Sequence, residues 1–445
     1  MSKLVTNGKV WVDGGLQEVA ILIDPAGKIS ELLTPAQAAE RTMDEVIDAA
    51  GACVLPGGID MHAHLQDGAE TFYQGTCAAA AGGLTSVVDM PPFHTCTTLS
   101  GYLGRKELAG QECAIDYCLG GGIVVSLDDL NGLGEVARLG APYFKVFMPA
   151  DSPVDTALLW ACVQTAARIG LRLALHAEEA AIINPIVDWG SPLGFPHARP
   201  AVAETSATAQ ALEMARAAGA PVHICHVSLG RTADLVDAYR GWGTDVTAET
   251  TPHHLLLDEG EYLRQGARVK TTPPLRPRED CELLWQALAG GVIDALVSDH
   301  FLGELPRPGA PPRDIQRAKA GIAGLELSLP LLYHAGVETG RLSLERFVQV
   351  TDTRPAQILG IPRRKGAIAP GLDADLVFLE THTPWKISPL GSFSRITTTP
   401  YQGWELSCRV RRTLVRGETI WDGASILTRR GYGQFLSFGI EQGQA

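Results

Sequence analysis

Two histidines, His62 and His64, are separated by a single alanine in the apolar stretch LPGGIDMHAHL. In a β-strand, residues i and i+2 point to the same face, so both imidazoles are expected to project together. Paired imidazole nitrogens are common metal ligands. The alternative is two histidines that share a face by chance, and this pair alone does not exclude it.

Lys145 lies inside another apolar stretch, YFKVFM. Lysine is rarely buried without a partner. A protonated amine offers no lone pair to a metal ion and repels it. Reaction with carbon dioxide would turn the amine into a carbamate, an anion that two cations can share. The alternative is a lysine that is ion-paired or that reaches solvent along its apolar stem.

Three more apolar runs end in residues of the same kind. His176 ends LALH, Asp299 ends ALVSD, and the run HICHVS carries both His223 and His226. Alternation along a strand does not choose between His223 and His226, so one is expected as a ligand and the other as a structural residue. A carboxylate at the end of an apolar strand is costly without a cation or a donor. Taken together, these strand ends predict one metal cluster.

A regular alternation of predicted strands and helices must position these residues. Between about residue 56 and residue 365, short apolar runs alternate with helix-like stretches such as 156–170 and 207–219. This alternation is typical of a parallel sheet covered by helices. Its length and repeat predict an α/β fold of the (β/α)₈ TIM-barrel type, in which functional residues lie at the C-terminal ends of the strands. A doubly wound sheet is the alternative, but no GxGxxG follows a strand.

Both ends of the chain have a different texture. Residues 1–55 and 366–445 read as short strands joined by turns, for example at Asn7-Gly8. The shared texture predicts a small β-sandwich domain built from both termini, beside a catalytic barrel of residues 56–365.

Composition excludes several classes of protein. Lys plus Arg is 37 and Asp plus Glu is 50, for a net charge of −13, which argues against a nucleic-acid binder. No apolar run reaches ~18 residues, so no membrane span is expected. The 9 cysteines are scattered without a C-x-x-C pair, and the N-terminal residues show no secretory pattern. These features predict a cytoplasmic protein without a disulfide framework.

Many motifs carry a family resemblance along nearly the whole chain. They are LPGGIDMHAHL, GTCAAAAGGLTSVVDMP, KVFM, HAEE, HICHVS, AETTPHHL, KTTPPLR, VSDH, KGAIAPGLDADLVFL and TPYQGWEL. In this order they resemble the cyclic-amide branch of the amidohydrolase superfamily, which contains dihydroorotases, allantoinases and hydantoinases (dihydropyrimidinases).

The resemblance implies a binuclear metal site. The positions that match the family's metal ligands are His62, His64, Lys145, His176, His226 and Asp299. By the same resemblance, Lys145 carries a CO₂-derived carbamate that bridges two divalent metal ions, usually Zn²⁺. Asp299 is also the proton shuttle when water opens the ring of a cyclic amide.

Substrate choice depends on positions that vary within the family. Gln66 stands where dihydroorotases have an arginine that holds the substrate carboxylate, and Pro92 and Phe93 stand where they have an Asn-bearing segment. Phe93 and Phe301 suggest apolar pocket walls, and Thr272 matches a position of backbone contact to the substrate. We therefore expect an allantoinase-like enzyme for a neutral ureide or imide. A dihydroorotase-like or hydantoinase-like enzyme is the alternative.

A second hypothesis is a non-catalytic scaffold of the same fold, which some hydantoinase relatives are. Such scaffolds lose metal ligands, whereas every expected ligand position is filled here. The resemblance also implies a homo-oligomer, a dimer or a tetramer, with a small-molecule cyclic amide as its partner and neither nucleic acid nor membrane.

Overall fold

Short parallel strands form the centre of the molecule. The computed structural model describes residues 1–91, 96–149, 154–184, 186–303, 315–388 and 399–438. The parallel strands are β8 (Gly58–His64), β9 (Leu84–Asp89), β10 (Asp116–Leu119), β11 (Tyr143–Phe147), β12 (Arg172–His176), β13 (Val222–Ile224), β14 (Val246–Thr250), β15 (Ala295–Leu296) and β16 (His300–Phe301). They form two sheets, in the orders β10-β9-β8-β16 and β11-β12-β13-β14-β15.

Two segments connect these sheets. Residues 295–301 pair with β14 through β15, and with β8 through β16. On the other side, Ile123 forms a parallel bridge to Lys145, and the Lys145 amide donates to the Gly122 carbonyl at 2.8 Å. The C-terminal ends of neighbouring strands therefore lie side by side. The predicted metal ligands lie at or near these ends.

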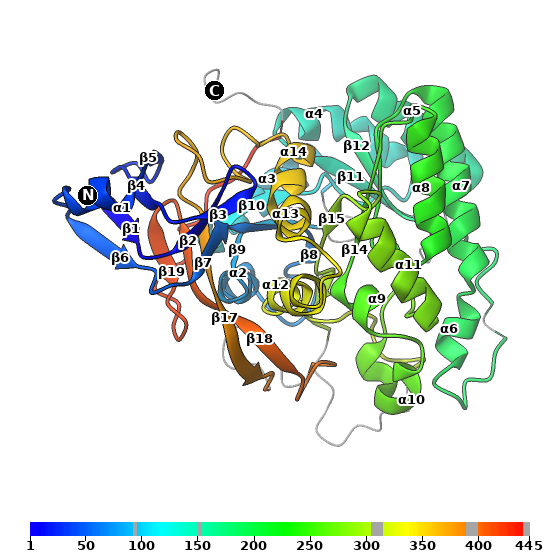
Figure 1. Cartoon of the computed structure of the whole chain (residues 1–445). Helices are drawn as coiled ribbons and strands as arrows, with labels where there is room; N and C mark the ends of the chain where they lie inside the picture. The colour runs from blue at the N-terminus through cyan, green and yellow to red at the C-terminus, as the bar shows by residue number, and fades with distance from the viewer. Residues whose placement is uncertain (92–95, 150–153, 185, 304–314, 389–398, 439–445) are drawn as a thin grey trace.

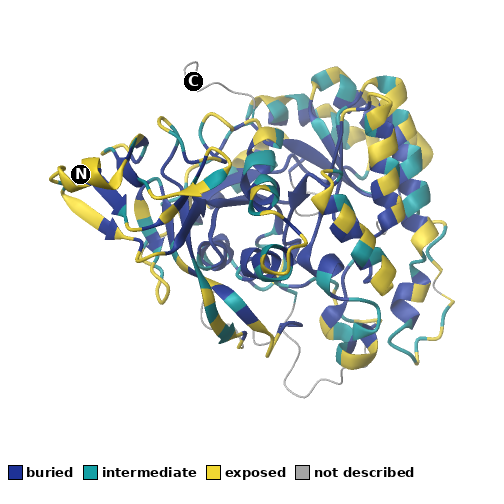
Figure 2. Cartoon of the chain, viewed as in Figure 1, coloured by how far each residue is buried: buried dark blue, intermediate teal, exposed yellow. Residues whose placement is uncertain are grey.

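The strands are buried because their side chains are apolar on both faces. In β11, Tyr143, Phe144 and Val146 are buried, as is Lys145 between them. Figure 2 shows the central strands in dark blue and the helices around them with exposed outer faces. This pattern is typical of parallel strands covered by helices.

Helices follow most of the parallel strands. The α-helices are α1 (Pro35–Ala39), α2 (Phe72–Ala81), α3 (Leu99–Glu112), α4 (Leu133–Arg138), α5 (Thr156–Ile169), α6 (Gly194–Ala198), α7 (Ala201–Ala218), α8 (Gly230–Gly241), α9 (Pro252–Leu256), α10 (Glu261–Gln265), α11 (Arg278–Ala289), α12 (Ser328–Leu332), α13 (Leu344–Val348) and α14 (Arg354–Ile358). Short 3₁₀ helices are η1 (Leu127–Asn131) and η2 (Gly266–Val269), and π-helical turns are η3 (Tyr333–Glu338) and η4 (Gln349–Thr353).

Helix α5 shows how local sequence sets these elements. Asp155 caps its first turn by accepting from the Leu158 amide, and Gly170 ends it in a left-handed conformation with φ 69°. Helix α5 packs on α7, and α7 packs on α8 (Figure 1). Across the described ranges, none of the helices combines the length and apolar character that a membrane crossing requires.

Strands from the two ends of the chain share one sheet. The terminal strands are β1 (Lys3–Thr6), β2 (Lys9–Val12), β3 (Gly15–Gln17), β4 (Ala20–Ile23), β5 (Ile29–Leu33), β6 (Glu45–Asp48), β7 (Cys53–Pro56), β17 (Leu376–Lys386), β18 (Glu405–Val415) and β19 (Glu418–Trp421). One sheet has the order β5-β4-β1-β6 and the other β19-β18-β17-β7-β2-β3. Strand β7 pairs with β17 in antiparallel register, so the two ends of the chain meet there (Figure 1).

The two terminal sheets share an apolar cluster. Val5 and Ile21 of one sheet pack in the same buried cluster as Val10, Leu376 and Leu414 of the other. The last described residues run back to the parallel strands, where the Tyr117 amide of β10 donates to the Gln434 carbonyl at 3.0 Å.

A buried ionic cluster joins β10 to the terminal strands. Lys365 is 2% exposed, and its Nζ lies 2.6 Å from Asp116 Oδ2 and 3.1 Å from Asp373 Oδ2. It also pairs with Asp375, and Arg416 pairs with Asp116. Lys365 is thus the cation shared by all three buried carboxylates, while Asp116 and Asp373 each have further cationic partners.

Lys365→Met is expected to destabilise the protein by roughly 3–5 kcal/mol, because it leaves buried carboxylates without their shared cation. Equilibrium unfolding in urea measures the free energy. The matched control is Arg341→Met, which removes an exposed partner of Glu282 at 2.6 Å and should cost below about 1 kcal/mol. Equal losses in the two variants would contradict the prediction.

Candidate metal centre

The C-terminal ends of five strand segments deliver the predicted metal ligands. His62 and His64 end β8, Lys145 lies within β11, and His176 ends β12. The other two positions, His226 and Asp299, lie shortly after the ends of β13 and β15. All of these residues are buried except His64, which is partly exposed.

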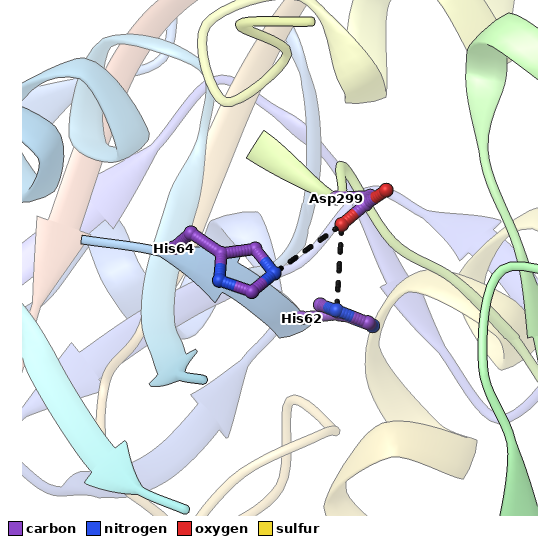
Figure 3. Close-up of side chains that lie close together, drawn as sticks. All are labelled: His62, His64 and Asp299. Carbon is purple, nitrogen blue, oxygen red and sulfur yellow. Dashed lines mark ion pairs between the residues drawn. The ribbon is translucent and has the colours of Figure 1, made fainter. Parts of the chain in front are cut away.

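One group gathers around the Asp299 carboxylate. Its Oδ1 atom lies 3.3 Å from His62 Nε2 and 3.7 Å from His64 Nε2. Figure 3 shows both imidazoles of β8 turned toward the same carboxylate oxygen. Ligand atoms of all three residues lie within 4.8 Å of one another, which is close enough for one metal ion.

A second group is formed by His176 and His226. Their Nδ1 and Nε2 atoms are 3.1 Å apart. The His226 ring centroid lies 5.2 Å from that of His62, so the two groups are neighbours. By contrast, His223 does not face this group, because its Nδ1 bonds to Thr247 Oγ1 at 2.8 Å and its Nε2 lies 2.9 Å from Glu249. The geometry favours His226, the histidine that the resemblance selects.

Lys145 contacts the residue that precedes His226 in the chain. Its Nζ lies 3.0 Å from the Cys225 thiol, which is its one hydrogen-bond partner within the described ranges. Lys145 is 3% exposed. A thiol is only a weak hydrogen-bond acceptor, so this contact offers the amine little compensation for its lost hydration.

In three of the four histidines, one ring nitrogen contacts a carboxylate. His62 Nδ1 pairs with Glu249, and His64 Nδ1 lies 3.0 Å from Asp67 Oδ2. His176 Nε2 lies 2.7 Å from Glu178 Oε2. A carboxylate on one ring nitrogen fixes the proton there and leaves a lone pair on the other nitrogen, as in many metal sites.

Sequence reasoning missed these three carboxylates and Cys225. A signal was present for two of them, because Asp67 and Glu178 follow a strand-end histidine by three and two residues. No local signal marks Glu249, since 187 positions separate it from His62.

Burial determines the charge states of the cluster. It lowers the pKa of His62 to about 3 and that of His176 to about 4, although their carboxylate partners act in the opposite direction. Burial also raises the pKa of Asp299 to about 7, against the charges of His64 and Lys145. Burial alone would raise the pKa of Glu178, but Arg199 and His176 outweigh it and lower that pKa to about 2. The imidazoles of His62 and His176 are therefore neutral, with lone pairs free.

Three residues of the site have left-handed backbone. The φ angle is 65° at Gln66, 35° at His226 and 45° at Asp299. Such angles are unfavourable for residues other than glycine and collect at functional sites. At His226 and Asp299 these angles occur shortly after a strand ends, and they turn the side chain away from the alternation of the strand.

The predicted substrate contacts are only partly placed. Phe301 lies edge-on to His64, with ring centroids 6.2 Å apart, and Gln66 follows β8 directly. Thr272 precedes Pro273, whose carbonyl accepts from His254 Nε2 at 3.1 Å, and no hydrogen bond joins Thr272 to the histidines in the described chain. Pro92 and Phe93 lie outside the described residues.

The residues fit divalent metal ions. His62 Nε2 is buried and has no hydrogen-bond partner in the described chain. Two nitrogens bound to one tetrahedral zinc lie about 3.3 Å apart, close to the 3.1 Å between His176 and His226. The donor set of imidazole nitrogens and carboxylate oxygens is one that zinc accepts.

Comparisons with known proteins identify the family. Residues 53–420 match the model of the amidohydrolase family. The allantoinase of Rubrobacter xylanophilus is 35% identical over 442 residues, covering 96% of this chain and 95% of that protein. The L-hydantoinase of Paenarthrobacter aurescens is 31% identical and covers 98% and 97%.

Solved structures agree as well. The L-hydantoinase (dihydropyrimidinase) from Arthrobacter aurescens has a TM-score of 0.91 at 30% identity, covering 98% of this chain and 99% of that one. The dihydropyrimidinase from Brevibacillus agri has a TM-score of 0.90 at 29% identity, with the same coverage. The resemblance predicted from the motifs is confirmed, and the chain belongs to the amidohydrolase family.

Proposed function

We propose that this protein is a metal-dependent hydrolase that opens the ring of a cyclic amide or ureide, with allantoinase-like substrate choice. The observation that carries the proposal is the cluster of His62, His64 and Asp299 at the C-terminal ends of parallel strands, with His176 and His226 beside it. Full-length similarity to allantoinases and hydantoinases supports the same reaction class.

The proposal includes the architecture that holds the site. We infer that the parallel strands of residues 56–365 close into a (β/α)₈ barrel, and that residues 1–55 and 366–445 form a β-sandwich. Pairing of residues 295–301 with both β14 and β8 supports closure. The apolar cluster shared by the two terminal sheets supports the sandwich.

Six side chains would hold two divalent ions, which we propose to be Zn²⁺. They are His62, His64, Lys145 as its carbamate, His176, His226 and Asp299. The buried setting of Lys145, with only a thiol as described partner, supports conversion of its amine to an anion. When bound, such ions lower the pKa of water and polarise a carbonyl group.

Asp299 is the group that moves the proton. It lies beside His62 and His64 and is almost fully buried. In the proposed reaction its carboxylate takes a proton from the attacking water and returns it to the ring nitrogen as the C–N bond breaks. Water thus adds its oxygen to the carbonyl carbon and its proton to the nitrogen, and the ring opens to a ureido or carbamoyl acid.

Gln66 supports a neutral substrate. It follows β8 within two residues of His64 and bears an amide where a dihydroorotase would bear arginine. An amide cannot form the bidentate, charge-assisted pair that a guanidinium makes with a carboxylate. Phe301, beside His64, adds an apolar wall. A hydantoinase-like preference is the alternative, which the solved hydantoinase structures favour.

A panel of allantoin, hydantoin, dihydrouracil, dihydroorotate and small cyclic imides tests the substrate. We expect the highest kcat/KM for allantoin and a value for dihydroorotate lower by roughly 10²-fold or more, since one lost buried charge contact costs about 2–5 kcal/mol. Preference for dihydroorotate would overturn the substrate proposal. Metal analysis of the same sample tests the non-catalytic scaffold, which would hold less than one equivalent and open no ring.

The remaining proposals concern assembly and location. We propose a homo-oligomer, a dimer or a tetramer, and the cytoplasmic location inferred from cysteine usage stays a prediction. Light scattering of the purified protein measures the first of these.

A further inference from the structure

One buried carboxylate contacts both candidate metal-binding groups. Glu249 is the residue before the last of β14 and is fully buried. Its Oε1 atom pairs with Nδ1 of His62 and accepts a hydrogen bond from the His226 backbone amide at 3.3 Å. Its Oε2 atom lies 2.9 Å from Nε2 of His223. Glu249 therefore links β14 to ligands carried by β8 and by the segment after β13.

The contact with His62 decides which ring nitrogen is free. A carboxylate on Nδ1 keeps the imidazole proton there, so Nε2 keeps its lone pair. That Nε2 atom lies 3.3 Å from Asp299 and has no hydrogen-bond partner in the described chain. Without Glu249, nothing else described holds the proton on Nδ1.

The contact with His226 acts on the backbone. His226 has a φ of 35°, which an L-residue adopts only when its surroundings enforce it. Glu249 accepts from the His226 amide, and its own carbonyl accepts from the Val227 amide at 2.8 Å. The same residue thus holds the turn that points His226 toward His176.

His223 in turn holds Glu249. The Thr247 hydroxyl lies 2.8 Å from His223 Nδ1. The same hydroxyl is also 3.5 Å from the Val222 carbonyl. When it donates to Nδ1 instead, the ring proton lies on Nε2, which is 2.9 Å from Glu249 Oε2 without forming an aligned hydrogen bond. His223 thereby gains a role that does not involve metal.

We propose that Glu249 is a positioning residue that orients His62 through its ring and His226 through its backbone, and that His223 acts through Glu249 instead of binding metal. This inference rests on the proposed metal-dependent function. It adds to the site two residues, Glu249 and His223, that are not among the six predicted ligands.

Glu249→Gln is the test. The amide keeps the shape but can no longer accept protons from two imidazoles at once. We expect zinc affinity, measured by chelator competition after reloading the metal-free protein, to fall 10–100-fold. We also expect kcat to fall more than KM rises, and the visible absorption of the cobalt-loaded protein to change.

The matched control is Glu204→Gln, the same change at a buried carboxylate that pairs with Ser228 and Arg276. It should leave zinc affinity within about threefold of wild type, since Glu204 contacts none of the four histidines in the described structure. A fall in affinity equal to that of Glu249→Gln would mean that any lost buried charge has this effect, and would overturn the proposal.

His223→Gln separates positioning from metal binding. We expect its zinc affinity to fall no further than that of Glu249→Gln, and the double variant to be no weaker than Glu249→Gln alone, because both changes break one connected unit. Complete loss of one metal equivalent in His223→Gln would overturn the inference. If Glu249→Gln fails to fold, His223→Gln alone still decides the point.

Failure of the positioning role and failure of the proposed function give different results in these experiments. Wild-type protein that binds two equivalents of zinc and opens rings, with a Glu249→Gln variant of unchanged zinc affinity and kcat, would refute the positioning role alone. Wild-type protein that binds no zinc would refute the proposed function.

Discussion

Lys145→Ala is expected to lose most of its bound metal and to lower kcat/KM by on the order of 10³-fold or more, since metal-assisted catalysis supplies several kcal/mol. Lys145 lies between the buried Phe144 and Val146 of β11, and its amine meets only the Cys225 thiol among described residues, at 3.0 Å. No carboxylate pairs with this amine in the described part of the chain. The proposed carbamate would place an anion at this position.

Short carboxylic acids provide the decisive measurement for this variant. Alanine leaves space where the lysine stem was, so acetate or propionate should restore part of the metal content and activity by supplying the missing anion. The control is Asp299→Asn, which the same acids should not rescue because its defect is different. Wild-type turnover of Lys145→Ala without added acid would exclude the carbamate. An independent measurement is the carbamate ¹³C signal after exposure to labelled bicarbonate, expected in wild type and absent in Lys145→Ala.

Apolar runs in the sequence predicted which strands bear the site residues, because such runs are a local signal. The run LRLALH contains β12, which ends at His176 as expected. Helix α1 is likewise set by local residues, with Thr34 as its cap and a proline in its first turn. These features depend on neighbours in the sequence, so the sequence is sufficient to predict them.

The choice between His223 and His226 could not come from alternation. Strand β13 ends at Ile224, and His226 has a φ of 35°, so the period of two no longer applies there. The same holds for Asp299, since β15 ends at Leu296 and Asp299 has a φ of 45°. A left-handed angle at an ordinary residue has no signature in composition, and only the resemblance selected His226 over His223.

The supporting carboxylates escaped prediction because their partners are distant in the chain. Glu249 is 187 positions from His62, and no periodic pattern brings β14 to β8. Their presence follows from tertiary structure, in which a buried imidazole that must offer one lone pair needs an acceptor for its other nitrogen. A search for carboxylates near strand-end histidines would have found Asp67 and Glu178 but not Glu249.

Asp299→Asn is expected to reduce kcat by about 10²–10⁴-fold, the range for loss of a positioned acid–base group. Asparagine has nearly the same shape, so its amide oxygen can still face His62 and His64, which lie 3.3 and 3.7 Å from the Asp299 oxygen. Metal is therefore expected to be retained in part. The amide cannot take up the proton of the attacking water, so binding and chemistry should separate in this variant.

Both quantities are measured on one preparation, with metal equivalents by elemental analysis and kcat on the substrate that the panel identifies. The matched control is Asp67→Asn, the same change in the carboxylate 3.0 Å behind His64. Because Asp67 acts on metal binding through His64, its loss should weaken metal affinity by 10–100-fold and be largely corrected by excess zinc. Excess zinc should not correct Asp299→Asn. If metal-loaded Asp299→Asn turned over within tenfold of wild type, another group would have to carry the proton, and the role assigned to Asp299 would be wrong.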